Sequence, residues 1–416
     1  MDNIKILYFS QFYTPESIAP SFRATENSKI WSDFGNSVTV FTGYPNYPTG
    51  KIFNGYSAKL LTEENIDGVR VLRSKLIAKP NTSIIRRLEN ALSYFFFGLV
   101  NIIINRKKIC TDYNVVLGTS GVIFNALLAE IFARINKIPF VLEIRDITYI
   151  QMQATGKSNK SMSVKGMKWL ELYLCKKAQK VVVVTNGFKK ILIEEGIPES
   201  KIHVITNGVD VKKCENINGQ KRLTLSYFGT LGVSQNIFNT FDYGTTISEL
   251  TDDFEYLIIG EGAQKEQILN KIKSRQFEFV RMLPGMPSKQ LESYYNNTQL
   301  SVITLNKSEN FKYTLPSKLF QIMGRGIAAL FIGPDGEAAE IIRKYNAGIA
   351  LTETKEKDLE ILRDFFSKPN WRKMLEEMGN NGHKAVEKYY SRRKLAEEYI
   401  LILKGVSKEN GNKKNV

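Results

Sequence analysis

Short apolar runs recur along the chain and alternate with segments that have helical periodicity. In the first half, the runs lie at 4–10, 37–42, 69–73, 114–120, 139–146, 180–186 and 201–206. Amphipathic stretches at 22–34, 122–136 and 187–195 separate several of them. Strands that are apolar on both faces, with helices between them, are typical of a parallel sheet covered by helices on each side. The first half therefore predicts a doubly wound α/β domain.

The same rhythm restarts after a polar segment at 207–221, which we interpret as a linker. New apolar runs lie at 223–229, 254–260, 277–283, 299–305 and 327–333, with amphipathic stretches at 264–273, 288–297 and 337–344. We predict one domain over 1–206, a second doubly wound domain over 222–388, and a helix with a disordered tail over 389–416. Ligands bind at the carboxyl ends of strands in open parallel sheets, so we expect the two sheets to face each other across a ligand-binding cleft.

The composition excludes several classes of protein. With 43% hydrophobic and 24% charged residues over 416 positions, the chain is neither disordered nor a coiled coil. Its longest apolar stretch, 94–104, is about half of the ~20 residues that a membrane-spanning helix needs. We expect no secretion signal, because no charged segment followed by an apolar one stands at the start of the sequence. The three cysteines are too far apart for a disulfide framework or a metal site. We therefore expect a cytoplasmic protein.

The positive charge is concentrated in the first half. Residues 1–190 hold 26 lysines and arginines against 13 acidic residues, and basic residues bracket the apolar stretch 91–104. This combination suits an anionic membrane surface, although a solvated basic face is the alternative. No nucleic-acid-binding module accompanies the charge, so we expect no nucleic-acid partner. The predicted membrane-facing residues are Arg86, Arg87, Phe95, Phe96, Phe97, Lys107 and Lys108.

Polar residues also follow the strands of the first half, where a ligand would bind. They lie after the first two strands, in the Gly-Thr-Ser-Gly turn at 118–121, and at the end of the run 139–146. Proline and glycine make turns regardless of function, so each loop alone is about as often structural as functional. The candidates are Ser17, Arg23, Asn46, Tyr47, Thr119, Ser120, Arg145 and Asp146.

Four loops after strands of the second half suit a nucleotide diphosphate. They are Gly229–Gly232, Gly260–Gly262, Pro316–Lys318 and Gly333–Glu337. Glycines let the backbone approach a phosphate closely, and helix N-termini carry partial positive charge. Lys318 can add a fixed positive charge. One such loop is weak evidence, but four on one edge of one sheet predict a nucleotide diphosphate site.

Several chemistries have no support in the sequence. The chain has two histidines, His203 and His383, which we interpret as structural. It contains no Asp-x-Asp motif, no His/Cys metal spacing, no Walker lysine loop and no Gly-x-Ser-x-Gly elbow. We therefore expect no metal and no cofactor besides the nucleotide substrate. The leaving diphosphate must then be neutralised by backbone N–H groups and by lysine or arginine.

The ordered motifs resemble a known family. The segments FVLEIRD, VVVVTNGF, ITNGVD, YFGTLG, LIIGEG and LPSKLFQIMGRG resemble the GT-B glycosyltransferases of family 4 over residues 4–390. PNYPTG together with PSKLF is most similar to the WbuB-like L-fucosamine (N-acetyl-L-fucosaminyl) transferases of capsule and O-antigen synthesis. The resemblance implies two Rossmann-like domains, a final helix that crosses back to the first domain, and metal-independent transfer with retention at the anomeric carbon.

The resemblance also implies roles for individual residues. It assigns the acceptor to the first domain, with Ser17, Arg23, Asn46, Tyr47, Thr119 and Ser120 as acceptor-side candidates. It assigns the nucleotide sugar to Gly229, Thr230, Leu231, Gly232, Gln235, Gly260, Glu261, Gly262, Pro316, Ser317, Lys318, Gln321 and Glu337. The catalytic candidates are Lys318, which would stabilise the leaving diphosphate, and Arg145 and Asp146, which would face the reacting sugar.

The chain departs from the family at two carboxylates. Family members have a glutamate that binds the ribose where this chain has Gln321, and another where it has Tyr313. An amide still accepts one hydroxyl hydrogen bond, but it lacks the charge that strengthens the interaction.

We therefore predict a retaining transferase that moves a sugar, for instance N-acetyl-L-fucosamine, from a UDP-sugar to a lipid-linked acceptor at the inner face of the membrane. A sugar-nucleotide 2-epimerase of the same fold is one alternative. A membrane-docked scaffold subunit that has lost catalysis is the other.

Overall fold

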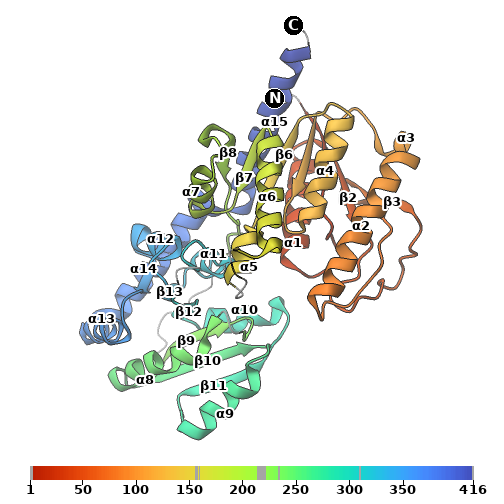
Figure 1. The fold of residues 1–416 in the computed structure, drawn as a ribbon. Helices are drawn as coiled ribbons and strands as arrows, with labels where there is room; N and C mark the ends of the chain where they lie inside the picture. The colour runs from red at the N-terminus through yellow and green to blue at the C-terminus, as the bar shows by residue number, and fades with distance from the viewer. Residues whose placement is uncertain are drawn as a thin grey trace. The chain divides into compact units, whose positions relative to one another are not determined.

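The computed structural model describes residues 3–154, 158, 160–212, 222–232, 235–308 and 311–414. The chain divides into two compact units, one of residues 1–206 and 396–416 and one of residues 207–395. Each has its own sheet (Figure 1). Most of the predicted linker, 213–221, lies outside the described residues.

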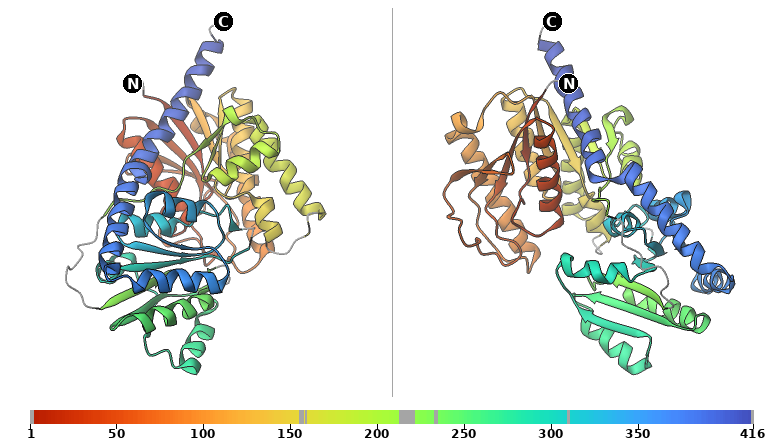
Figure 2. Two further views of the ribbon diagram at one scale, coloured as in Figure 1. Left: turned by 90° about the vertical axis from the view of Figure 1, so that its left-hand side faces the viewer. Right: turned by 180° about the vertical axis from the view of Figure 1, so that it is seen from behind.

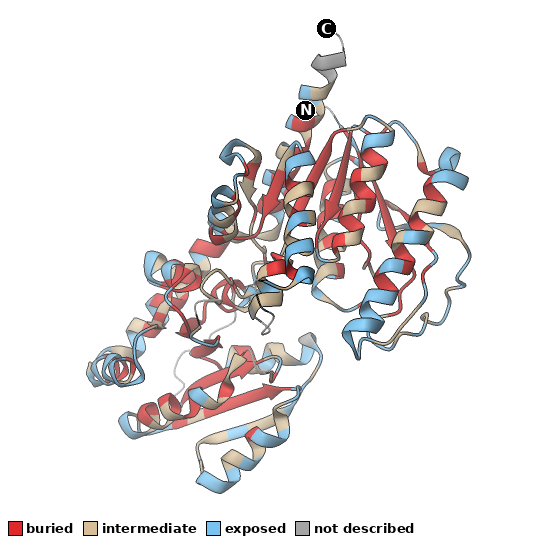
Figure 3. Cartoon of the chain, viewed as in Figure 1, coloured by how far each residue is buried: buried red, intermediate tan, exposed pale blue. Residues whose placement is uncertain are grey.

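The first unit is built on an eight-stranded sheet in the order β3-β4-β2-β1-β5-β6-β7-β8. Its strands are β1 Lys5–Phe9, β2 Ser37–Gly43, β3 Leu61–Ile66, β4 Val69–Ser74, β5 Val115–Thr119, β6 Phe140–Ile144, β7 Lys180–Val183 and β8 Ile202–Val204. All pairings are parallel except that of β3 with β4. The interior strands are almost wholly buried, as apolar runs in a covered parallel sheet must be (Figure 3).

Helices cover both faces of this sheet (Figures 1 and 2). The helices of this unit are α1 Ala19–Asp33, α2 Ile84–Ile104, α3 Arg106–Ile109, α4 Ile123–Ile135, α5 Thr148–Ala154, α6 Met162–Lys177, α7 Asn186–Glu194, the short η1 Glu199–Lys201, and, from Ala396 on, α15 Arg392–Lys414. On one face, α4 lies between α2 and α6 and packs against both. On the other, the Trp31 ring of α1 meets Tyr399 of α15 edge-on, and Trp31 Nε1 donates to the Ala396 carbonyl.

The second unit is built on a six-stranded, fully parallel sheet in the order β11-β10-β9-β12-β13-β14. Its strands are β9 Leu223–Phe228, β10 Phe254–Gly260, β11 Val280–Pro284, β12 Leu300–Thr304, β13 Ala328–Ile332 and β14 Gly348–Leu351. Its helices are η3 Ile237–Asn239, α8 Thr240–Leu250, α9 Lys265–Arg275, α10 Ser288–Asn296, α11 Ser317–Gly324, α12 Glu337–Tyr345, α13 Lys355–Ser367, α14 Trp371–Ala385 and η5 Val386–Tyr390.

The prediction of two α/β domains with parallel sheets is confirmed. The sequence missed two edge strands, β3 and β14. β3 has the sequence LTEENI and is the antiparallel edge of its sheet, so its exposed side chains give no apolar run. β14 is four residues long and starts at Gly348, which gives it too little apolar sequence to stand out.

Candidate functional site

The glycine loop after β9 and the lysine at the start of α11 meet in the second unit. A Cβ atom added at Gly229 would lie 2.5 Å from the Lys318 Nζ and 3.2 Å from its Cε. β9 and β12 are neighbours in the sheet, so the segments that follow them emerge at the same edge. The predicted association of the Gly229–Gly232 loop with Lys318 is therefore present in the geometry.

The amine of Lys318 lies over an aromatic ring, at the end of a half-buried side chain. Its Nζ is 3.7 Å from the centroid of the Tyr227 ring, and burial lowers the pKa of Lys318 to about 7. The Tyr227 hydroxyl donates to the Thr230 carbonyl at 2.7 Å, so the same residue supports the loop from below. The site thus offers an ammonium group held against a loop that approaches it closely.

A second loop packs tightly against the first. A Cβ atom at Gly260 would lie 2.0 Å from the Gly229 carbonyl oxygen, and one at Gly262 would lie 2.3 Å from that of Leu231. Only glycine fits at these two contacts. The Gly229 amide donates to the Ile259 carbonyl at 2.9 Å and the Leu231 amide to the Glu261 carbonyl at 2.8 Å.

This packing reduces the number of backbone amides that can contact the phosphates. The sequence assigned all four residues Gly229–Gly232 to the nucleotide sugar, but the amides of Gly229 and Leu231 hold the two loops together. Within the described part of the chain, the amides of Thr230 and Gly232 have no hydrogen bond and are left for a ligand.

Two pockets adjoin at Gly229 and Leu291, which line both. The first, of about 470 Å³, is lined by Gly260, Glu261 and Gly285 among others. The second, of about 380 Å³, is lined by Gln321, Glu292 and Arg325. We call them the Gly260 pocket and the Glu292 pocket. In the first, the Glu261 carboxylate accepts from the Gly285 amide at 3.1 Å and pairs with Lys265 at 2.8 Å.

The other predicted nucleotide residues surround this edge of the sheet without entering those pockets. Pro316 is the N-cap of α11 and Ser317 is its first, exposed residue. Gln235 folds back so that its Oε1 lies near Gly232. Glu337 opens α12 after β13, one strand further from β9. Tyr313 is half-buried in the segment before α11.

In the first unit, Arg23 is a buried structural residue. Its Nε donates to Glu143 Oε1 at 2.8 Å, and its terminal nitrogens donate to the carbonyls of Ile205 and Thr206. Burial would raise the pKa of Glu143, but Arg23 and then Arg145 outweigh it and hold the pKa below its ordinary value. Arg23 therefore stabilises the strand ends, and the structure does not support its assignment as an acceptor contact.

Arg145 and Asp146 follow β6 but differ in exposure. Arg145 donates to the Ala19 carbonyl at 3.1 Å, and burial, followed by the nearby charge of Arg23, lowers its pKa. Asp146 is exposed. Thr119 and Ser120, at the end of β5, are 5% and 1% exposed, so their side chains are enclosed rather than presented to solvent.

Asn46 also has a structural role. Its amide nitrogen donates to the Tyr44 carbonyl, its Oδ1 accepts from Asn90, and its backbone N–H donates to Glu16 at 2.9 Å. The Tyr47 N–H donates to the same Glu16 oxygen at 2.9 Å. Glu16 was missed by the sequence analysis, although it lies beside exposed Ser17 in the same loop. It ties together the loops that follow β1 and β2.

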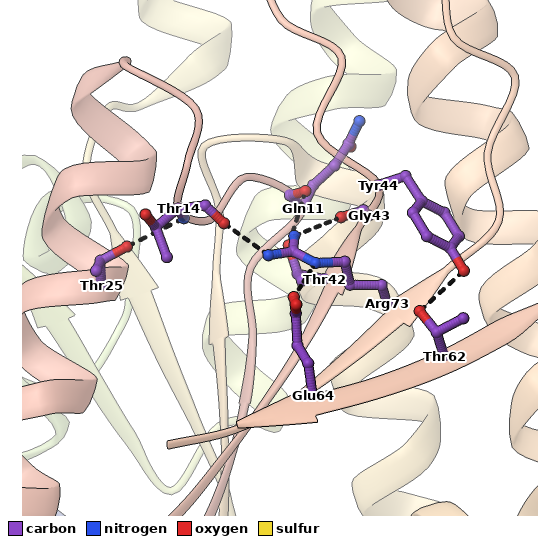
Figure 4. A network of polar contacts seen from close by, with 9 residues as sticks. All are labelled: Gln11, Thr14, Thr25, Thr42, Gly43, Tyr44, Thr62, Glu64 and Arg73. Carbon is purple, nitrogen blue, oxygen red and sulfur yellow. Dashed lines mark hydrogen bonds and ion pairs between the residues drawn. The ribbon is translucent and has the colours of Figure 1, made fainter. Parts of the chain in front are cut away.

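Arg73 is a second residue that links these two loops, and the sequence did not reveal this role (Figure 4). This fully buried side chain pairs with Glu64 and donates to the Thr14 carbonyl at 2.7 Å and the Gly43 carbonyl at 3.3 Å. From the sequence it was only one of the 26 lysines and arginines counted in residues 1–190. The structure instead makes it an internal anchor for the loops after β1 and β2.

Helix α2 buries several polar side chains and exposes a stripe of apolar ones. The buried Asn90, Tyr94 and Asn101 hydrogen-bond to Asn46 Oδ1, Asn125 Oδ1 and the Leu60 carbonyl. The exposed stripe consists of Ile84, Leu88, Leu92, Phe96 and Ile103, which are 42–75% exposed. The spacing of four or seven residues places them along one side of the helix.

Most of the predicted membrane residues lie on this exposed surface. Arg86, Arg87, Phe96, Lys107 and Lys108 are exposed. Phe95 is not, because it packs against the core and against Phe124, with ring centroids 6.0 Å apart. Phe97 is half-buried, with the Lys75 amine 5.2 Å from its ring centroid.

By length and composition alone, α2 is the one helix among the described residues that could cross a bilayer. The sequence estimate of an eleven-residue stretch at 94–104 was therefore too short, because the helix extends back to Ile84. A helix of a water-soluble domain can pass the same test. The hydrogen bonds from Asn90, Tyr94 and Asn101 show that α2 is an integral part of the first unit.

Two family models match the chain. Residues 35–213 match the family described as Glycosyltransferase Family 4, and residues 212–385 match that described as Glycosyl transferases group 1. The chain is a glycosyltransferase. It joins a family 4 N-terminal domain to a group 1 C-terminal domain, so the predicted enzyme class and the resemblance to family 4 are confirmed. The fucosamine-transferase branch stays a prediction.

Relatives of this glycosyltransferase cover its whole length. An uncharacterized glycosyltransferase from Methanocaldococcus jannaschii is 22% identical over 97% of this chain and 98% of its own. Sucrose-phosphate synthase from Thermosynechococcus elongatus superimposes with a TM-score of 0.70 at 12% identity, covering 97% of this chain and 99% of that one. Anabaena HepE in complex with UDP gives a TM-score of 0.65 at 12% identity, covering 97% and 100%. These similarities show the GT-B fold.

Proposed function

We propose that this glycosyltransferase moves a sugar from a UDP-sugar to a lipid-linked acceptor, without a metal and with retention at the anomeric carbon. The proposed sugar is an N-acetylated deoxyhexose such as N-acetyl-L-fucosamine, in capsule or O-antigen synthesis. The motif resemblance supports the sugar class. The structures of Anabaena HepE with UDP and with UDP-glucose support the nucleotide.

The observation that carries the proposal is the position of the Lys318 amine against Gly229. As the bond between the anomeric carbon and the diphosphate breaks, negative charge grows on the leaving phosphate. A lysine ammonium beside the open amides of Thr230 and Gly232 offsets that charge where it develops. In our proposal Asp146, exposed at the end of β6, positions the acceptor, and Arg145 supports the strand end beside it.

Helix α2 supports the membrane location. A soluble domain gains nothing from turning Ile84, Leu88 and Phe96 towards water while burying Asn90 and Asn101. An apolar stripe flanked by Arg86, Arg87, Lys107 and Lys108 matches an anionic lipid surface, where acyl chains and phosphates lie close together. We propose that this stripe holds the enzyme on the inner face of the cell membrane, close to its lipid-linked acceptor.

The test is transfer by the purified enzyme from UDP-acetamido sugars to a polyprenyl-diphosphate-linked acceptor, with and without EDTA. We expect a product whose new glycosidic bond keeps the anomeric configuration of the donor. EDTA should leave product formation unchanged, and Lys318→Ala should abolish it. A requirement for metal or an inverted product would contradict the proposed mechanism. Conversion of the UDP-sugar without acceptor would favour the 2-epimerase. If no donor gave either transfer or donor hydrolysis, that result would favour the scaffold subunit. The presence of Gln321 and Tyr313 in place of the family's glutamates motivates this alternative.

A further inference from the structure

The Glu292 pocket contains a carboxylate that the sequence analysis did not single out. Glu292 lies on α10 and lines the pocket together with Gly229 and Gln321. Its side chain is 28% exposed, so it can reach a ligand. The nucleotide site that we propose therefore lacks a glutamate on α11 but has one on the neighbouring helix.

Glu292 is held in place from one side. Arg325 Nη2 donates to Glu292 Oε1 at 2.9 Å, and the Arg325 guanidinium lies 4.3 Å above the Tyr295 ring. Arg325 Nη1 also donates to the Gln321 carbonyl at 3.1 Å, which fixes the guanidinium to α11. This arrangement orients the carboxylate, and among the described residues Glu292 Oε2 has only the exposed Lys212 amine, 3.7 Å away.

The chemistry of the pocket indicates what Glu292 binds. A carboxylate repels a phosphate, so the group that it meets beside the glycine loop must donate hydrogen bonds. A nucleoside diphosphate whose phosphates lie at Gly229 carries such a group next to its phosphates. This group is the 2′,3′-diol of its ribose. Gln321 has one amide oxygen and no charge, which makes it the weaker acceptor of the two.

We propose that Glu292, positioned by Arg325, accepts hydrogen bonds from the ribose hydroxyls of the donor nucleotide. The inference rests on the proposed nucleotide-sugar function and adds a specificity-determining residue to it. Because a charge-assisted hydrogen bond contributes about 1.5–3 kcal/mol, loss of a ribose hydroxyl should weaken binding by roughly 10-fold to 100-fold.

The experiment compares UDP with 2′-deoxy-UDP by isothermal titration calorimetry. The proteins are wild type, Glu292→Gln and the control Glu340→Gln, which changes an exposed glutamate on α12 outside both pockets. We expect wild type and control to prefer UDP by about 10-fold or more. Glu292→Gln should bind UDP about 10-fold more weakly while its affinity for 2′-deoxy-UDP changes little, so the preference should nearly disappear.

The outcomes separate this inference from the function on which it rests. A preference for UDP that survives in Glu292→Gln would overturn the assignment of Glu292 and leave the nucleotide site intact. An equal loss of affinity for both nucleotides would also overturn it, because it would indicate general damage to the pocket. Failure of the wild-type protein to bind UDP, GDP, dTDP, CDP or ADP would overturn both the inference and the proposed function.

Discussion

The Lys318 amine lies 3.7 Å from the centroid of the Tyr227 ring, and among the described residues no carboxylate forms an ion pair with it. An ammonium over an aromatic face is stabilised by the electrons of the ring, but less than by a paired anion. Burial dominates, and the pKa of Lys318 falls to about 7. The amine is thus held close to the point at which it changes charge, and an arriving diphosphate would favour its charged form.

This relationship predicts that UDP binding depends on pH. Below pH 7 the amine carries its proton and attracts the diphosphate. Above pH 7 binding must also take up a proton, so affinity should fall by up to about tenfold per pH unit. Calorimetry between pH 6.5 and pH 8.5 checks this, with Lys318→Met as the control for changes in the nucleotide itself. A wild-type profile as flat as that of Lys318→Met would contradict the prediction.

Gly229→Ala should damage the same site through the backbone. The added Cβ would lie 2.5 Å from the Lys318 Nζ, and the residue has a φ of +153°, which disfavours a side chain. We expect UDP affinity to fall about tenfold and stability to fall by about 1–2 kcal/mol. Gly232→Ala is the matched control, because its Cβ would approach the end of another side chain, Gln235 Oε1, at 2.6 Å, while Gly232 has no positive φ. Equal UDP affinity of the two variants would show that close approach at Gly229 is unimportant.

Arg73→Met should destabilise the first unit without touching the second. The substitution removes an ion pair with Glu64 and leaves the carbonyls of Thr14 and Gly43 without their donor (Figure 4). Loss of a buried charged partner costs about 3 kcal/mol. Arg70→Met, which breaks a more exposed pair with Glu63, should cost at most about 1 kcal/mol. Urea denaturation of both variants measures the difference, and similar losses would argue against Arg73 as the anchor.

The buried carboxyl group of Glu16 predicts that the difference in stability between wild type and Glu16→Gln depends on pH. Burial raises its pKa above the ordinary value of 4.5, although the N–H groups of Asn46 and Tyr47 act in the opposite direction. A raised folded-state pKa means that stability is present in full below the ordinary pKa and declines as pH rises through the folded value. Glu16→Gln keeps an acceptor for both N–H groups and cannot ionise. Its stability relative to wild type should therefore increase as pH rises from 4 to 8.

The control for Glu16 separates charge from hydrogen bonding. Glu16→Ala removes the acceptor and should be less stable than Glu16→Gln at every pH, by about 1–3 kcal/mol, because two buried N–H groups lose their partner. Thermal unfolding of the three proteins across the pH range measures both effects. A stability difference between Glu16→Gln and wild type that does not change with pH would show that the carboxyl titrates normally.

The fold was predictable because its signal is local. Each buried strand of a parallel sheet is an apolar run in its own right, so β1, β9 and β13 are visible without knowledge of their neighbours. The association of Gly229 with Lys318 was also within reach, since the order of loops after strands determines which segments share an edge. The edge strands escaped detection because exposed side chains and short length remove the apolar run.

The electrostatic role of a charged residue was harder to predict, because it depends on partners far away in the sequence. Arg23 pairs with a glutamate 120 positions later, and Arg73 reaches the Thr14 carbonyl 59 positions before it. From the sequence, Arg23 was an acceptor-side candidate and Arg73 was only one of the 26 basic residues of 1–190. The burial of polar residues on α2 was hidden for the same reason, since Asn90 and Asn101 can be buried only where Asn46 and the Leu60 carbonyl supply partners.

The outward apolar side of α2 predicts membrane binding that needs both charge and apolar contact. Arg86→Glu with Arg87→Glu should abolish flotation with vesicles that contain anionic lipid, and the wild-type protein should bind less in high salt. The matched control, Arg363→Glu with Lys384→Glu, makes the same change of charge at exposed positions of the second unit. Leu88→Ser with Phe96→Ser should weaken binding while every charge is kept, because each exposed side chain would otherwise enter the lipid. Both substitutions lie on the solvent side of α2, so thermal stability should change little. Binding that ignores anionic lipid, or that survives both the charge and the apolar changes, would show that this surface has another purpose.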